Sequence, residues 1–178
     1  MRNLKRALSL GLTATMISGL MVMGSSAASY ADVTSKQNEE AIEVLKTVGI
    51  MVGDENGKFN PEAKVTRNEM AVVMCNLLDY TVASYKGTSP FTDVPDGQWY
   101  TDAVLWAAEN NITDGTSETT FSPNDALTRE QMATFFYRFA NFEAGEPIEV
   151  TGDLSGYTDA DLVADYAVDA MTWAVGEG

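Results

Sequence analysis

Apolar positions along the chain follow a helical period in four segments. In residues 41–48 and 70–77 they recur at intervals of three and four, so that they share one face of a helix. Residues 103–107 and 132–139 show the same pattern. The intervening stretches are rich in Gly, Asn and Pro, which is typical of connecting loops. The chain is therefore predicted to be mainly α-helical, with turn-rich loops between the helices.

The chain contains an internal repeat. The segment "VTRNEMA" at 65–71 returns as "LTREQMA" at 127–133, a shift of 62 residues. With this shift and without a gap, nine residues of the first copy fall on identical residues of the second. In the first copy they are Ala41, Ile50, Gly53, Phe59, Pro61, Thr66, Arg67, Met70 and Ala71. Each copy is predicted to form a helix, a loop with a Phe-x-Pro motif and a second helix. The Phe of this motif is expected to anchor the loop to the core.

A third copy begins but is incomplete. "YADV" (30–33) and "FTDV" (91–94) open the first two copies, and "YTDA" (157–160) opens the third. The sequence ends at Gly178, before the third loop. A helix over 161–175 is expected there, with an apolar face that lacks its own partner. The predicted repeats are 32–86, 87–145 and 146–178, with polar linkers at 80–90 and 141–156.

The second helix of each copy has a clear start signal. Thr66 precedes Glu69 by three residues, and Thr128 precedes Gln131 in the same way. This spacing is the capping box, in which two side chains bond each other's backbone amides at the helix start. The apolar stripes expected behind the caps are Met70, Val73, Met74 and Leu77 in the first copy and Met132, Phe135, Phe136 and Phe139 in the second.

The capping boxes place Arg67 and Arg129 at the first position of their helices. A cation is unfavourable there because the helix dipole carries positive partial charge at its N-terminus. Backbone amides at a helix start can bind an anion, and a guanidinium beside them can hold a carboxylate through two parallel hydrogen bonds. We therefore predict an anion-binding role for both arginines. The alternative is an arginine whose stem packs while its head pairs with a surface Asp or Glu.

Residues 1–31 have the pattern of a secretory signal peptide. Arg2, Lys5 and Arg6 precede an apolar run, and small residues follow it. Removal of this leader takes away three of the 11 basic residues and none of the 26 acidic ones, which leaves a formal charge of −18. Such a surface repels nucleic acid and anionic lipid. Neither is expected as a partner, and no membrane insertion is expected after cleavage.

Residue types that support catalysis or metal binding are scarce. The chain has no His, and Cys75 is its single cysteine, expected in the core rather than as a reactive thiol. The segment 54–62 has a passing likeness to a calcium loop, but Gly57 is misplaced and Lys58 stands where an oxygen ligand is needed. No catalytic residue, metal site or cofactor is predicted.

Trp99 offers a different kind of ligand contact. It stands among polar residues in "DGQWY", and an indole ring suits stacking against the flat apolar face of a sugar. The alternative is an aromatic residue that anchors the turn to the core. Trp106 and Trp173 lie within helical patterns and are predicted to be core residues.

Together these motifs resemble the S-layer homology family. The second copy reads "FTDVPDGQWYTDAVLWAAENNITDG…FSPNDALTREQMA", and the first reads "YADV…GIMVGDENGKFNPEAKVTRNEMA". The resemblance implies repeats in a mainly α-helical, pseudo-threefold (trefoil-like) arrangement. It also implies a secreted, non-catalytic module at the cell wall that attaches its protein to the bacterial cell surface.

The resemblance further implies a ligand and its binding residues. The ligand is a secondary cell-wall polysaccharide with pyruvylated amino sugars, held in grooves between repeats, where its carboxylate would meet the arginines. The binding residues implied are Arg67, Arg129, Trp99, Asp32, Asp93, Asp159, Gly53 and Gly115, supported by the caps Thr66, Glu69, Thr128 and Gln131.

Two other functions remain open on the sequence. The repeats could form a self-assembly module that contacts other surface-layer subunits, in which case binding to walls stripped of polysaccharide is expected. They could also be the anchoring end of a longer secreted enzyme that acts on the wall. In that case the catalytic part is expected beyond Gly178.

Overall fold

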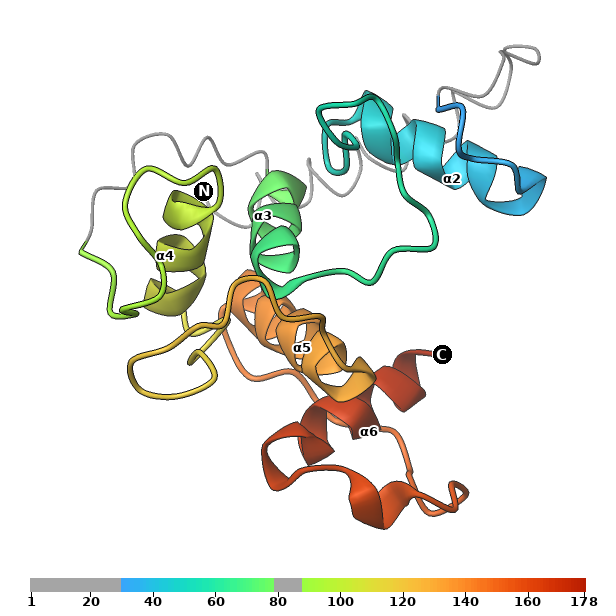
Figure 1. Ribbon diagram of the computed structural model, residues 1–178. Coiled ribbons are helices and arrows are strands. Elements are labelled where there is room, and N and C mark those ends of the chain that lie inside the picture. The colour runs from blue at the N-terminus through green and yellow to red at the C-terminus, as the bar shows by residue number, and fades with distance from the viewer. Residues whose placement is uncertain (1–29, 79–87) are drawn as a thin grey trace. The chain divides into compact units, whose positions relative to one another are not determined.

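The computed structural model describes residues 30–78 and 88–178 (Figure 1). These residues form five α-helices and two short 3-10 helices, which confirms the predicted mainly α-helical fold. The elements are α2 (Lys36–Thr47), α3 (Arg67–Leu77), α4 (Thr101–Glu109), α5 (Arg129–Ala144), η2 (Ala160–Leu162), η3 (Asp165–Ala167) and α6 (Val168–Glu177). Within the described ranges there is no strand, and Thr66 and Ala126 form an isolated antiparallel bridge.

The chain divides into two compact units between Glu62 and Ala63. The first unit contains α2 and the loop after it, and the second contains α3 to α6. The pseudo-threefold arrangement and the repeat boundaries stay predictions. Residues 1–29 of the expected signal peptide and most of the 80–90 linker lie outside the described residues. In the described part of the chain, the helices are too short or too polar to cross a membrane.

The first helix of each of the first two repeats ends in the same left-handed turn. Gly49 follows α2 with a φ of +75°, and Asn111 follows α4 with a φ of +57°. The amide of the next residue donates to a carbonyl in the last turn of the helix. The distance is 2.9 Å for Ile50 after α2 and 2.8 Å for Ile112 after α4. Asn tolerates this backbone region better than other residues that carry a side chain. The predicted ends of both helices are confirmed.

Both predicted capping boxes are present. In α5, the Gln131 amide donates to Thr128 Oγ1 and the Thr128 amide donates to Gln131 Oε1, both at 3.2 Å. In α3, the Glu69 carboxylate accepts the Thr66 amide at 2.8 Å. Local side chains therefore determine where each second helix begins.

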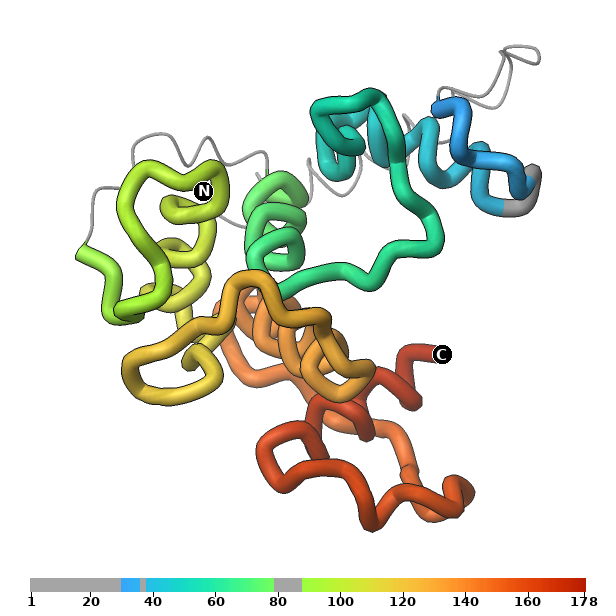
Figure 2. The backbone as a smooth tube through the Cα atoms, viewed as in Figure 1, coloured from blue at the N-terminus to red at the C-terminus, as the bar shows by residue number. Residues whose placement is uncertain are grey.

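The loop between the helices of each repeat is anchored by its Phe. In the second repeat, Phe121 is fully buried, and its ring lies 5.6 Å from the ring of Phe91. In the first repeat, the half-buried Phe59 lies 5.6 Å from Tyr30. The anchoring role predicted for the Phe-x-Pro motif is confirmed in both. Figure 2 traces the second of these loops from α4 to α5.

In each of the first two repeats, the opening aspartate binds the loop between the two helices. The Asp93 carboxylate accepts the amides of Phe121 and Ser122 at 2.8 and 2.7 Å. Asp32 accepts the two corresponding amides at 3.1 and 2.7 Å. Desolvation would raise the pKa of Asp32, but these amide bonds outweigh it and hold that pKa below its usual value. The carboxylates stabilise a left-handed turn, since Ser122 and Asn60 have φ values of +56° and +57°.

Gly115 allows the second loop to pack closely. Its φ is +82°, and a Cβ there would lie 2.4 Å from the Thr120 carbonyl oxygen and 2.6 Å from the Phe91 ring. Gly53 has a φ of +77° in the first loop, and a Cβ there would lie 2.7 Å from the Tyr30 ring. Both positions therefore require Gly for conformational and for steric reasons.

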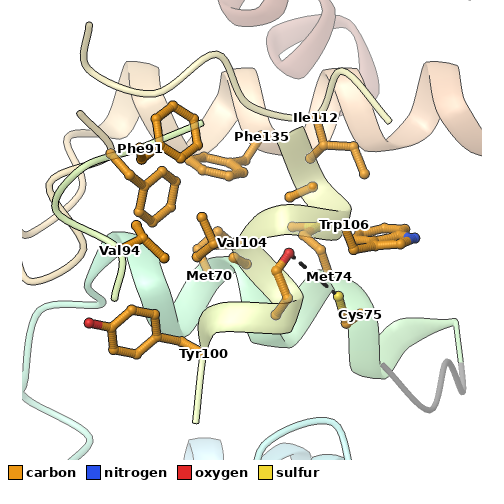
Figure 3. Close-up of a cluster of buried hydrophobic side chains, with 14 residues drawn as sticks. Met70, Met74, Cys75, Phe91, Val94, Tyr100, Val104, Trp106, Ile112 and Phe135 are labelled. Atoms are coloured by element: carbon orange, nitrogen blue, oxygen red, sulfur yellow. Dashed lines mark hydrogen bonds between the residues drawn. The ribbon is translucent and has the colours of Figure 1, made fainter. Parts of the chain in front are cut away.

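A hydrophobic core in the second unit joins α3, α4, α5 and the loop of the second repeat (Figure 3). Its buried members are Met70, Ala71, Met74, Cys75, Phe91, Val94, Tyr100, Ala103, Val104, Trp106, Ala107, Ile112, Phe121 and Phe135. Cys75 and Trp106 are thus core residues, as predicted. Burial raises the pKa of the Cys75 thiol to about 12.

The buried faces of α3 and α5 differ from the predicted stripes at two positions, because Leu77 and Phe136 are exposed. In α3, the buried face is rotated toward Ala71 and Cys75. These small side chains lie in the core with Ala103 and other residues of α4, which allows the two helices to approach closely. The spacing of the apolar residues correctly predicted two helices, but it did not show on which side of each helix its neighbour lies.

The C-terminal region also differs from expectation. The 3-10 helices η2 and η3 precede α6, where a single helix over 161–175 was predicted. Helix α6 packs against α5 (Figure 1), and the rings of Trp173 and Tyr137 lie 5.7 Å apart. The expectation that this region lacks a partner helix is therefore wrong, and Trp173 is half-buried rather than fully in the core. Helix α5 continues to Ala144, into the predicted 141–156 linker.

Asp93→Asn is expected to destabilise the second unit. The substitution removes the charge that accepts two loop amides, and bonds to a charged group contribute about 1.5–3 kcal/mol each. We expect a loss of roughly 2–3 kcal/mol in unfolding free energy, measured by urea titration. Asp96→Asn, at an exposed site of the same segment, serves as the control and should change stability by less than about 0.5 kcal/mol. Equal stability of the two variants would contradict the role of Asp93.

Gly115→Ala is expected to be more damaging than Gly97→Ala. Both glycines have a positive φ, +82° and +77°, but a Cβ at Gly97 would meet nothing within 4 Å. The control variant should therefore lose about 1 kcal/mol for backbone strain alone, and Gly115→Ala roughly 2–4 kcal/mol, since steric contact is added. Chemical denaturation of both variants measures the difference. Similar losses would show that close packing at Gly115 is unimportant.

Cys75 is expected to resist thiol reagents in the folded protein. Because its pKa is about 12, the thiol stays protonated at pH 8, and its burial blocks access. Titration with a chromogenic disulfide reagent should therefore show slow labelling in buffer and rapid labelling in denaturant. Rapid labelling of the native protein at pH 8 would contradict the buried position.

Candidate ligand-binding site

The side chain of Arg67 is buried although it starts a helix. It is 4% exposed, and its Nε donates to the carbonyl oxygen of Phe121 at 2.6 Å. The guanidinium carbon lies 4.8 Å from the ring centroid of Phe121 and 5.6 Å from that of Phe135. The guanidinium is therefore held in one orientation by a hydrogen bond and two aromatic rings.

The backbone at the start of α3 is not an open anion site. The amide of Arg67 donates to the Asp125 carbonyl and the amide of Asn68 donates to the Pro123 carbonyl, both at 3.0 Å. The Glu69 amide donates to the side chain of Asn68 at 2.7 Å. The expectation that free amides of this turn would receive an anion is wrong, because two loop carbonyls and the Asn68 side chain accept their hydrogen bonds. At α3, an anion-binding role falls to the guanidinium alone.

A pocket of about 290 Å³ lies beside this guanidinium. It is bordered by Arg67, by the loop after α4, by one face of α5 and by a Tyr from η3. Its lining residues are Arg67, Ile112, Thr113, Asp114, Gly115, Thr116, Gln131, Thr134, Phe135, Arg138 and Tyr166. The pocket thus combines two guanidinium groups with hydroxyl and amide groups and two aromatic side chains.

Arg67 remains available to an external anion. Within the described ranges its side chain makes one hydrogen bond, through Nε, and no ion pair with an acidic residue. Burial lowers the pKa of Arg67, and nearby Tyr166, Asp125 and Asp93 oppose this effect. Because a guanidinium titrates above about 12 in water, Arg67 carries its charge at neutral pH. It is a buried cation without a carboxylate partner in the described part of the protein.

The pocket rim is fixed by contacts between α5 and the C-terminal region. The Tyr166 hydroxyl donates to Glu130 Oε1 and the Ala164 amide donates to Glu130 Oε2, both at 3.1 Å. Burial raises the pKa of Tyr166, and the hydrogen bond to Glu130 adds to this effect. Tyr166 is 52% exposed and belongs to the lining of the pocket.

The structure brings together only some of the predicted site residues. Arg67, Gly115 and Gln131 line the pocket. Arg129 is exposed at the start of α5, and Trp99 is 65% exposed with its ring edge-to-face with Tyr100. The predicted residues that do not line the pocket are Arg129, Trp99, Asp93, Asp159, Asp32, Gly53, Thr66, Glu69 and Thr128.

Several lining residues were missed by the sequence analysis, notably Arg138 and Tyr166. A signal for Arg138 was present, because Gln131, Thr134 and Arg138 recur at intervals of three and four and so share one face of α5. That face is polar, whereas the predicted stripe of α5 comprised only apolar positions. No comparable signal marks Tyr166, which reaches the pocket from a 3-10 helix.

Comparison with known proteins identifies the repeats. Residues 29–71 and 90–133 each match the S-layer homology domain family. The chain is 35% identical to the "Surface-layer 125 kDa protein" of Lysinibacillus sphaericus over 168 residues, which are 93% of this chain and 14% of that protein.

Two relatives from Acetivibrio thermocellus carry other names. The "Cellulosome-anchoring protein" is 35% identical over 89 residues, 49% of this chain and 20% of that protein. "Exoglucanase XynX" is 29% identical over 138 residues, 78% of this chain and 12% of that protein. The chain thus spans a fifth or less of the length of these relatives. Through its two matched repeats, each with a Thr-Arg helix start, the chain belongs to the S-layer homology domain family.

Proposed function

We propose that this chain is a non-catalytic module that anchors its protein to the bacterial cell surface by binding an acidic wall polysaccharide. The ligand we propose is a secondary cell-wall polysaccharide with pyruvylated amino sugars. The observation that carries this proposal is Arg67, a buried guanidinium at a pocket of about 290 Å³, with no acidic partner among the described residues.

A sugar carboxylate suits the free side of this guanidinium. Arg67 uses Nε for the Phe121 carbonyl, which leaves its terminal nitrogens for a ligand. Two parallel N–H bonds to one carboxylate are a strong and geometrically selective contact. The rings of Phe121 and Phe135 already hold the group in place, so little side-chain entropy is lost on binding.

The rest of the pocket suits a carbohydrate. Thr113, Thr116 and Thr134 place hydroxyl groups around it, and Gln131 contributes an amide. Such groups can exchange hydrogen bonds with sugar hydroxyls. The half-exposed ring of Tyr166 can stack on the apolar face of a sugar. We assign to Tyr166 the stacking role that the sequence analysis gave to Trp99.

The charge of the chain makes this pocket distinctive. The formal charge is −15, so an anion is repelled from most of the surface. Between residues 63 and 178 there are five basic residues, which are Lys64, Arg67, Lys86, Arg129 and Arg138. Two of these, Arg67 and Arg138, line the pocket. An acidic polymer would therefore be attracted to this point rather than to the surface as a whole.

Relatives support a cell-surface role. Two of them are named as a surface-layer protein and a cellulosome-anchoring protein. The enzyme activity named for XynX belongs to a protein of which this chain matches 12%, and the residues shared with it need no catalytic role. A module that attaches different proteins to the same wall accounts for such diverse relatives.

We extend the proposal to a second site at Arg129. This residue repeats the Thr-Arg motif and is exposed at the start of α5. In the described part of the chain, the backbone amides of Arg129 and Glu130 make no hydrogen bond, in contrast to those of α3. Arg129 would therefore bind an anion more openly and more weakly than Arg67. Asp159 and Trp99 are further candidates for ligand contact outside the pocket.

The experiment is a co-sedimentation assay with purified cell-wall sacculi. Arg67→Gln should weaken binding roughly 10- to 100-fold, because a buried charge contact is lost. Lys64→Gln, which removes an exposed positive charge nearby, is the control and should bind normally. Arg129→Gln is measured separately, and we expect a smaller loss. The wild-type protein should also bind poorly to sacculi from which mild acid has removed the pyruvyl groups.

Circular dichroism must show that Arg67→Gln is folded, since the side chain is buried. Arg67→Lys gives a second test, because it retains the charge but loses the two-pronged geometry. Normal binding by a folded Arg67→Gln variant would overturn the role of the pocket. Undiminished binding to acid-treated sacculi would overturn the pyruvyl ligand.

Self-association is a second candidate function. Tyr157 and Leu162 are exposed apolar side chains in the C-terminal region, and a relative is named as a surface-layer protein. Exposed apolar residues of this kind can form a protein–protein contact. Binding to sacculi stripped of polysaccharide, together with concentration-dependent sedimentation of the free protein, would favour this function.

A further inference from the structure

We propose that Arg138 is a second anion contact of the pocket, and that Asp114 is an internal competitor which the ligand carboxylate must displace. This inference rests on the proposed function, because it concerns how the same pocket selects an acidic sugar. It assigns a role to an ion pair that the sequence analysis did not anticipate.

The ion pair lies at the pocket itself. Arg138 Nη2 and Asp114 Oδ2 are 2.6 Å apart, and both residues belong to the lining. Arg138 projects from the polar face of α5, whereas Asp114 belongs to the loop after α4. The contact thus joins two separate walls of the pocket, and it places a carboxylate on one of the two guanidinium groups that a ligand would meet.

The two arginines of the pocket differ in their partners. Arg67 is 4% exposed and has no carboxylate on it within the described ranges. The side chain of Arg138 is 29% exposed and already holds Asp114, whose side chain is 70% exposed. An ion pair this open to water contributes little net stability. A ligand carboxylate can therefore replace Asp114 without a large loss of folding energy.

Displacement gives the pocket selectivity for charge. A neutral sugar offers nothing to replace Asp114, so Arg138 stays paired and unavailable to it. An acidic sugar can pair with Arg67 and Arg138 together, while Asp114 turns toward water. Asp114 also repels an incoming anion until it is displaced. Asp114 thus lowers the affinity of the pocket for every anion. Only an anion that contacts both arginines gains enough binding energy to outweigh this effect.

The competing interpretation is a structural one, in which the ion pair holds the loop after α4 against α5. The two interpretations predict opposite signs for one substitution. If Asp114 competes with the ligand, Asp114→Asn should tighten binding. If the ion pair supports the loop, the same substitution should weaken binding. The asparagine is close in size to aspartate, so the comparison isolates the charge.

The experiment is calorimetric titration with two probes. One is the methyl glycoside of an N-acetylhexosamine with a 4,6-O-pyruvate ketal, and the other is its neutral isopropylidene ketal, in which a methyl group replaces the carboxylate. Asp114→Asn should bind the acidic probe about three- to tenfold more tightly, as expected for removal of one nearby like charge. Arg138→Gln should bind it about tenfold more weakly. Asp96→Asn is the control and should leave affinity unchanged.

The double variant Asp114→Asn/Arg138→Gln tests the coupling. Without Arg138, Asp114 has no cation to withhold, so adding Asp114→Asn to Arg138→Gln should tighten binding less than it does in the wild type. Equal tightening in both backgrounds would mean that Asp114 acts only as a repelling charge, and it would overturn the competition.

The outcomes also separate this inference from the proposed function. Unchanged or weaker binding by Asp114→Asn, with Arg67→Gln still defective and the acidic probe still preferred by the wild type, would overturn the competitor role and leave the polysaccharide proposal standing. Equal binding of both probes by the wild type would overturn the proposed function and this inference with it.

Discussion

The contact between Arg67 and the loop of the second repeat is the interaction on which the second unit and its pocket depend. The guanidinium Nε bonds the Phe121 carbonyl, and the ring of the same residue lies against the charged group. Phe121 is also fully buried in the core. One residue therefore orients the cation and anchors the loop. For this reason the cation can stay buried without an internal carboxylate, since the aromatic ring and the carbonyl replace part of its hydration.

Local features of this fold were readable from the sequence. The helix starts at Thr66 and Thr128 and the helix ends at Gly49 and Asn111 follow from residues a few positions apart, so a single repeat contains the information. The pocket was only partly readable. The Thr-Arg motif singled out Arg67, but it gave no indication that the amides of this turn would be occupied by carbonyls from a loop more than 50 residues later. Likewise, the opening aspartates were assigned to a ligand, whereas Asp93 binds the loop backbone. The first outcome depends on packing between repeats, and the second depends on a contact between segments of one repeat that lie 28 residues apart.

The two copies of the Thr-Arg motif have different surroundings although their sequences are nearly the same. The second-repeat loop covers Arg67, whereas Arg129 is exposed in the described part of the chain. A motif therefore does not define a site on its own. The next repeat contributes the carbonyls, the aromatic ring and the pocket wall, and the C-terminal region contributes Tyr166. In this unit, the pocket is lined by residues from both matched repeats and from the C-terminal region.

The hydrogen bonds from the start of α3 to Pro123 and Asp125 restrict how this chain can change length. Seven positions separate Phe121 from Thr128, and the same number separates Phe59 from Thr66. Between Phe121 and Thr128, the chain buries an aromatic ring, places two carbonyls against the start of α3 and then begins α5. A residue inserted between Pro123 and Leu127 would shift the ring, the carbonyls and the helix start relative to one another. Sequence drift is therefore better tolerated here by substitution than by insertion or deletion. This agrees with the internal duplication, in which residues 41–71 align with residues 103–133 without a gap.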